Sequence, residues 1–174
     1  MQALSVGYRV KRLVVRMVLL ALGTAFEQVS KRVRELGDEI ARWEDGRTFA
    51  VGVLPDGPTI ALRKEGSRIR YLGEGDHGAP LRILFKNLEA ALPLLLGRAG
   101  SHVAFARHSA VVQGNVAEAA EANRAMVIVQ QYLFPEFILR KILKRRPTPT
   151  GRQRWIKIQI LAGLFPAMAL TYKR

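Results

Sequence analysis

The sequence predicts an α+β fold: a five-stranded, mainly antiparallel sheet covered by helices, with basic amphipathic helices at both termini. Three observations predict it. Apolar residues follow helical spacing over the first 44 residues. A period of two then dominates from Phe49 to Phe85. Helical spacing returns after that, interrupted by one short apolar segment from Ala110 to Gln113 that predicts a fifth strand.

The first helical stretch extends from Val6 to about Glu44. We expect a break near Gly23 and Thr24, because Thr24 can cap a second helix and Glu27 follows three residues later, as in a capping box. This break suggests three parts: a basic amphipathic helix over residues 1–23, a central domain over 24–133, and basic apolar helices over 134–174.

Four alternating segments then follow, separated by turns rich in glycine and proline. We expect them to form an antiparallel meander with one apolar face and one positively charged face. The alternating apolar residues are Phe49, Val51, Val53, Ile60, Leu62, Ile69, Tyr71, Leu81, Ile83 and Phe85.

Two further helices complete the predicted domain. Asn87 can cap a helix that carries Leu92, Leu95 and Leu96 on its apolar side. After the fifth strand, Gly114–Asn115 is a turn that leads into a helix from Val116 to about Leu133.

Composition excludes several classes of function. The 174 residues contain no cysteine, which removes disulfides, thiolate nucleophiles and cysteine metal sites and fits a reducing, cytoplasmic compartment. Lys and Arg number 28 against 14 Asp and Glu, a net charge of +14, which indicates a polyanionic partner. That partner is either acidic lipid headgroups or the phosphates of a nucleic acid.

The distribution of charge favours the lipid. No acid occurs before Glu27 or after Glu136, and both ends combine basic with apolar residues, as proteins at a membrane surface do. The uncharged run Met17–Phe26 and the apolar run Ile158–Tyr172 are both short for a membrane span, so we expect peripheral association. The predicted membrane contacts are Arg9, Lys11, Arg12, Arg16, Lys141, Lys144, Arg145, Arg146, Arg154, Trp155 and Lys157.

No catalytic or metal site is predicted. Residues 73–78 match the dinucleotide fingerprint G-x-G-x-x-G, but a strand follows them, and Glu74 and Asp76 would repel phosphate. His102 and His108 are six residues apart, which does not place them on one helix face. The serines lie in no nucleophile elbow. We therefore expect no catalytic residues, no metal and no cofactor.

Two motifs resemble the sterol carrier protein type two (SCP2, sterol-binding) domain family. The first is an alternating strand, a polar cap and a leucine helix ending at glycine, with Ile83, Phe85, Asn87, Leu88, Leu92 and Gly97. The second is the family's A-F…aliphatic-x-G-Asp/Asn text, matched by Ala104, Phe105, Val112, Gly114 and Asn115, with His108 in place of the family's glycine. The resemblance covers about Thr24 to Leu133.

The resemblance implies a non-enzymatic domain that holds a sterol, fatty acyl chain, phospholipid or isoprenoid in a hydrophobic tunnel. It also allows an accessory factor that presents lipid intermediates to a biosynthetic enzyme, for example in ubiquinone biosynthesis. A nucleic-acid-binding protein remains the alternative on net charge alone. Any single leucine of the set could be plain core, because a cavity is a property of the whole set. The expected ligand contacts are Phe49, Val51, Val53, Ile60, Leu62, Ile83, Phe85, Leu92, Leu95, Leu96, Phe105 and Met126.

Overall fold

The computed structural model describes residues 6–95 and 108–133, together with the isolated helical residues Trp155, Ile158 and Ala162. The described elements form an α+β fold with five strands, which confirms the predicted class. In chain order they are α1 (Val6–Ser30), α2 (Arg34–Ile40), β1 (Thr48–Val53), β2 (Thr59–Glu65), β3 (Arg68–Glu74), β4 (Leu81–Phe85), α3 (Leu88–Leu95), β5 (Ala110–Gln113) and α5 (Val116–Leu133).

The five strands form one sheet in the order β3-β2-β1-β4-β5. Pairing is antiparallel except between β1 and β4, which run parallel with Phe49 opposite Leu81 and Val53 opposite Phe85. The sheet is therefore mainly antiparallel, as predicted, but the simple meander is wrong. After β3 the chain crosses over β2 and β1 to place β4 beside β1, because β2 and β3 already occupy the other side of β1.

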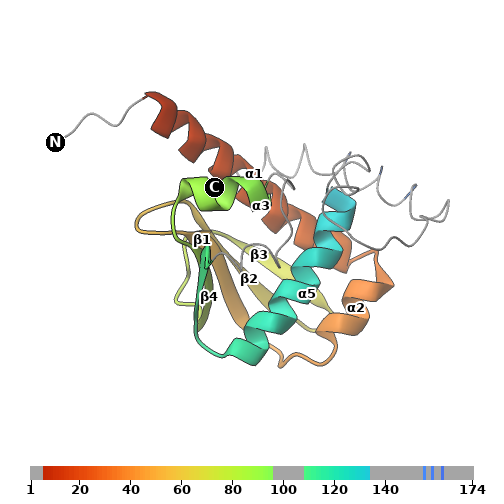
Figure 1. Ribbon diagram of the computed structural model, residues 1–174. Helices are drawn as coiled ribbons and strands as arrows, with labels where there is room; N and C mark the ends of the chain where they lie inside the picture. Colours follow the sequence, from red (N-terminus) through yellow and green to blue (C-terminus); the bar gives the residue numbers. More distant parts are fainter. Residues whose placement is uncertain (1–5, 96–107, 134–154, 156–157, 159–161, 163–174) are drawn as a thin grey trace.

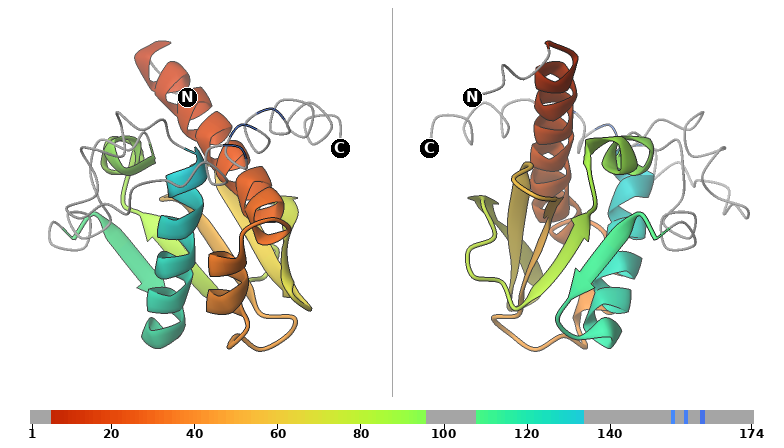
Figure 2. Two further views of the ribbon diagram at one scale, coloured as in Figure 1. Left: turned by 90° about the vertical axis from the view of Figure 1, so that its right-hand side faces the viewer. Right: turned by 60° about the vertical axis from the view of Figure 1, so that its left-hand side comes forward.

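The described helices lie on one face of the sheet, so the domain has two layers (Figures 1 and 2). Alternation directs Phe49, Val51 and Val53 toward the helices, where all three are buried. The opposite face carries small residues: Ala50 and Ala61 are fully buried there against Ala79 of the β3–β4 connection. Small side chains on that face allow this connection to lie close to the sheet.

Helix α1 is continuous from Val6 to Ser30, so the break expected at Gly23–Thr24 is wrong. Thr24 does not cap a second helix. Its hydroxyl donates to the carbonyls of Leu20 (2.9 Å) and Ala21 (3.0 Å), an ordinary arrangement for threonine inside a helix. The domain boundary placed at residue 23 falls inside this helix.

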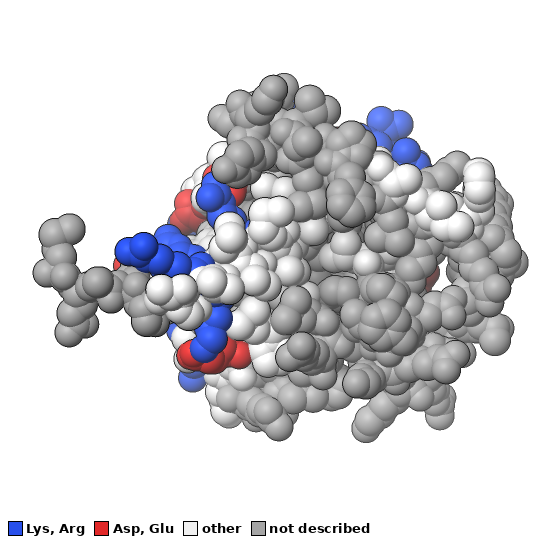
Figure 3. Space-filling view, turned by 90° about the horizontal axis from the view of Figure 1, so that it is seen from above, with Lys and Arg blue, Asp and Glu red and all other residues white. Residues whose placement is uncertain are grey.

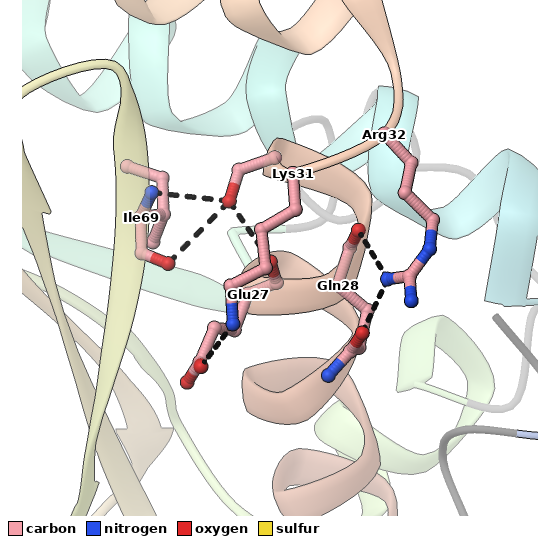
Figure 4. Close-up of polar contacts among 6 residues, drawn as sticks. Glu27, Gln28, Lys31, Arg32 and Ile69 are labelled. Atoms are coloured by element: carbon pink, nitrogen blue, oxygen red, sulfur yellow. Dashed lines mark hydrogen bonds and ion pairs between the residues drawn. The ribbon is translucent and has the colours of Figure 1, made fainter.

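At the C-terminal end of α1, side chains donate hydrogen bonds to backbone carbonyl oxygens of the last turn (Figure 4). The buried hydroxyl of Ser30 donates to the Glu27 carbonyl (3.0 Å) and accepts from the Ile69 amide of β3 (3.1 Å). Lys31 forms an ion pair with Glu27 (2.7 Å), and Arg32 donates to the backbone and side-chain oxygens of Gln28. The actual break in the helical region therefore lies between Ser30 and Arg34.

Helix α1 is long and apolar enough to cross a membrane, because it contains an 18-residue apolar window. This window is longer than the uncharged run Met17–Phe26 considered in the sequence. More than half of that window (56%) is buried against the rest of the protein, which is the environment of a core helix. The second apolar run, Ile158–Tyr172, lies almost entirely outside the described residues.

Candidate functional site

The apolar face of the sheet consists of rows of side chains in register across the strands. One row contains Leu81, Phe49, Leu62 and Tyr71, from β4, β1, β2 and β3. The next row contains Ile83, Val51 and Ile60. Helices α1, α3 and α5 lie over these rows, which form one continuous hydrophobic cluster with them.

The structure brings most of the predicted ligand contacts together in this cluster. The buried members are Phe49, Val51, Val53, Ile60, Leu62, Ile83, Phe85, Leu95 and Met126. Leu92 is half-buried and packs against the cluster, whereas Leu96 and Phe105 lie outside the described residues. The described residues of the predicted set therefore lie together in one cluster. Whether they contact a ligand stays a prediction.

Helix α1 contributes a wall that the sequence analysis did not assign to the site. Val15, Leu19, Leu22 and Phe26 are fully or almost fully buried in the same cluster. Phe26 meets Phe49 edge to face, with ring centroids 5.8 Å apart. The spacing of four, three and four residues from Val15 to Phe26 indicates one apolar helix face that could have been assigned to the cluster. It was not, because the first 23 residues were assigned to a separate helix.

Helix α3 is positioned by its cap. The side-chain oxygen of Asn87 accepts from the Ala90 amide (2.7 Å), which confirms the predicted N-cap. The Lys86 amide donates to the Ser109 carbonyl (3.0 Å), so the start of α3 lies beside the start of β5. On this side Leu92, Leu94, Ala110 and Val112 are half-buried, so the cluster is less completely covered here than over β1 and β2.

The basic residues predicted to contact a membrane divide into two groups on α1. Lys11 forms an ion pair with Glu89 of α3 (2.9 Å), and Arg16 with Glu74 of β3 (2.6 Å). Arg9 and Arg12 are exposed and form no ion pair within the described part of the chain. Trp155 is exposed; the remaining predicted contacts, Lys141, Lys144, Arg145, Arg146, Arg154 and Lys157, lie outside the described residues.

The glycine-rich segment that matches the dinucleotide fingerprint is the end of β3 and its connection to β4. Strand β4 follows it rather than a helix, as the sequence indicated. His77 has a positive φ of 48° and its Nε2 lies 2.9 Å from the Glu74 carbonyl oxygen, so it belongs to the turn. Among the described residues, no group of three His, Cys, Asp or Glu side chains could hold a metal ion.

Comparison with known proteins identifies the fold. No protein-family model and no curated protein matches the chain. Among solved structures, a conserved hypothetical protein from Thermus thermophilus, described as "possibly sterol carrier protein", matches with a TM-score of 0.51 and 18% identity over 65% of this chain and 85% of that one. A second match is "UbiJ-SCP2 Ubiquinone synthesis protein", at a TM-score of 0.43 and 15% identity over 67% and 96% of the two chains.

The chain has a sterol carrier protein-like fold. The match to the Thermus protein agrees with the resemblance read from Ile83 to Asn115, and its low identity limits the conclusion to the fold. In this sterol carrier protein-like fold, the rows of β1, β2 and β4 face the helices.

In the described part of the chain, two side-chain atoms are buried at this apolar layer without a hydrogen-bond partner: the Trp43 indole Nε1 and the Tyr71 hydroxyl. Trp43 meets Phe49 edge to face at 5.8 Å, and the Arg47 guanidinium lies 5.6 Å above its ring. Arg47 is anchored by Glu121 of α5 at 2.5 Å. Both unpaired groups can donate, and donors inside an apolar site are the usual means of orienting a ligand.

Burial raises the pKa of Tyr71 to about 12, with the Glu74 carboxylate adding to the rise and Arg16 opposing it. The folded protein therefore favours the protonated phenol. The stability that follows from this preference is fully present below the ordinary pKa of 10 and is lost as pH rises from 10 toward 12.

Tyr71→Phe is expected to keep or slightly increase stability at pH 8, by up to about 1 kcal/mol, because a buried hydroxyl without a partner is removed. Between pH 10 and 12 the parent should lose stability relative to the variant. Urea unfolding of both proteins at about pH 8 and about pH 11 measures this difference. The pKa of Tyr132 is also raised by burial, but that effect is common to both proteins and cancels. A variant clearly less stable than the parent at the lower pH would contradict the prediction.

Proposed function

We propose that this protein is a non-catalytic lipid-binding protein that holds an apolar lipid against the hydrophobic cluster beside helix α3 and strand β5. The observation that carries the proposal is the incompletely covered part of the hydrophobic cluster at α3 and β5. There Leu92, Leu94 and Val112 are half-buried beside the fully buried Ala91 and Leu95. An acyl or isoprenoid chain laid along these side chains would bury them further, at about 25 cal/mol for each Å² of apolar surface.

The sterol carrier protein-like fold supports this proposal, because the comparable Thermus protein is described as "possibly sterol carrier protein". The composition of the face agrees with it: sites for small apolar ligands are lined mainly by hydrophobic side chains with a few placed polar groups. We further propose that the protein acts in the cytoplasm at a membrane, where its lipid originates.

The test is to extract the purified full chain with organic solvent and identify the lipid by mass spectrometry. The proposal expects an apolar lipid in near-stoichiometric amount. An isoprenoid would favour the accessory role in a biosynthetic pathway, and a sterol, fatty acid or phospholipid would favour carriage. Protein free of lipid that also fails to bind a fluorescent fatty acid would overturn the proposal.

Ala91→Trp locates the site. Ala91 has no exposed surface and lies on the side of α3 that faces the cluster. In a fully packed core the larger side chain would destabilise the fold by about 1–3 kcal/mol or more. If a lipid occupies space at this point, the indole should instead take that space, with near-parent melting and loss of the fluorescent fatty acid.

The matched control is Ala120→Trp, on the exposed side of α5, which should change neither property. Leu95→Trp provides a second position on the buried side of α3, since Leu95 is 2% exposed. Unfolding of both α3 variants, or probe binding equal to that of the parent, would place the lipid elsewhere.

A further inference from the structure

The N-terminal half of α1 carries a stripe of exposed apolar side chains. Val6, Val10, Leu13 and Met17 are separated by four, three and four residues, which aligns them along one side of a helix. Their exposed fractions are 79%, 54%, 57% and 43%. They are four of the seven large apolar residues exposed in the described part of the chain, and we call them the docking stripe.

The docking stripe is confined to the part of α1 that projects from the domain. Figures 1 and 2 show the first turns of α1 extending beyond the sheet and the other helices. The same line of side chains continues with Leu20 and Thr24, which are buried (4% and 5% exposed). The stripe is roughly 16 Å long at about 1.5 Å per residue, so one rigid helix passes from an exposed apolar surface into the core.

Positive charge flanks the docking stripe. Helix α1 has no acidic residue before Glu27. Arg9 lies next to the stripe and Arg12 further round the same turns of the helix; both are exposed and form no ion pair among the described residues. Seen from above, Lys and Arg side chains lie at this end of the molecule around uncharged surface, with a few Asp or Glu side chains among them (Figure 3). The complementary surface must therefore be apolar inside and acidic at its edge.

Two exposed ion pairs connect α1 to the rest of the domain. Lys11 is held by Glu89 of α3 and Arg16 by Glu74 of β3, so different elements of the domain hold the middle of α1. These two residues were predicted as membrane contacts from their charge alone. Both pairs are exposed to solvent, so contact of Lys11 and Arg16 with a membrane stays a prediction, as it does for Arg9 and Arg12.

We propose that the docking stripe inserts into the interfacial region of an anionic bilayer, with Arg9 and Arg12 on lipid phosphates. A bilayer supplies both required properties, because acyl chains lie directly beneath acidic headgroups. A second copy of the docking stripe fits less well, since the projecting half of α1 has no acidic residue with which to meet Arg9 and Arg12. This inference deepens the proposed function. The biological role of membrane binding rests on that function, but binding to vesicles itself does not require a lipid in the site.

The first test measures flotation of the full chain with vesicles of phosphatidylcholine alone and with vesicles containing one-quarter phosphatidylglycerol. Val10→Ser/Leu13→Ser should bind the phosphatidylglycerol vesicles about ten-fold more weakly than the parent, or weaker still, because two apolar side chains no longer enter the bilayer. Its matched control is Val116→Ser, which removes an exposed apolar side chain (73%) at the start of α5 and should bind like the parent.

The second test separates local from total charge. Arg9→Gln/Arg12→Gln should weaken binding about thirty-fold, since each basic side chain at an anionic surface contributes about five-fold. Arg42→Gln/Arg68→Gln removes the same charge from exposed positions elsewhere and should have a much smaller effect.

Three results would overturn the inference. One is equal binding to both kinds of vesicle. Another is unchanged binding by the Val10→Ser/Leu13→Ser variant. The third is a parent that sediments as a dimer and becomes a monomer in that variant, because the stripe would then bind a second copy. Retained binding of the fluorescent fatty acid by the docking variants, against its loss in Ala91→Trp, distinguishes failure of docking from failure of the proposed function.

Discussion

Phe49→Ala is expected to lower the free energy of unfolding by about 3–5 kcal/mol, the usual cost of removing a fully buried phenylalanine. Phe49 has no exposed surface and contacts both Phe26 and Trp43 edge to face at 5.8 Å. Leu62 and Leu81 are its register partners on the two neighbouring strands. Removing its ring would leave a cavity where α1, the sheet and the Trp43 loop meet.

Urea unfolding followed by circular dichroism measures this loss. Val116→Ala, at an exposed position, serves as the control and should change stability by less than about 0.5 kcal/mol. A loss below about 1 kcal/mol for Phe49→Ala would show that the ring lines a space rather than fills the core. Phe49 would then count as a ligand contact, and added lipid should stabilise the parent more than the variant.

Gly23→Ala should be destabilising by about 1–3 kcal/mol, although replacing glycine by alanine inside a helix usually stabilises it. A methyl group at Gly23 would lie 2.5 Å from Cδ2 and 2.6 Å from Cε2 of the Tyr71 ring. The absence of a side chain at this position lets the middle of α1 approach β3 closely. The alanine forces the helix and the strand apart.

Gly7→Ala is the matched control, because Gly7 lies in the same helix with nothing within 4 Å of the added methyl group. Because Gly7 is the second residue of α1, this replacement should leave stability unchanged or raise it by less than about 0.5 kcal/mol. Combining Gly23→Ala with Tyr71→Ala should recover most of the packing loss, and a double-mutant cycle of thermal unfolding measures that coupling. Additive effects in the cycle would show that the close contact is not the cause.

The sequence allowed the strands and their buried faces to be predicted because both depend on local pattern. Alternation at Phe49, Val51 and Val53 requires only that a strand has two faces. The cap at Asn87 likewise depends on a side chain and an amide three residues apart.

The pairing of β1 with β4 could not be predicted in this way. The alternation of apolar and polar residues indicates which face of a strand is buried. It does not indicate which other strand pairs with it. The same limit explains α1: Thr24 has the chemistry of a cap, but its hydroxyl finds the Leu20 carbonyl inside a continuous helix. What decides the outcome is the packing of Val15, Leu19 and Leu22 against the sheet, which requires the whole fold.

Membership of the apolar cluster was predicted in part for the same reason. The alternating strand residues were expected in it, whereas the α1 residues were missed because the helix was assigned to a separate unit. The sequence also did not show which apolar side chains of α1 are exposed, because the same helix carries the buried Val15 and the exposed Val10 and Leu13.

The placement of α1 has a consequence for how the chain folds during synthesis. Helix α1 leaves the ribosome before the other described elements, yet it packs against β3, α3 and α5, and α5 ends at Leu133. Its inner face therefore stays without its full set of partners while about a hundred further residues are made. Contacts between segments so far apart in the sequence form late and slow folding. Until they form, the exposed apolar side chains of the nascent chain can associate with other proteins. The inner face of α1 is therefore the part of the nascent chain most exposed to association until α5 has been made.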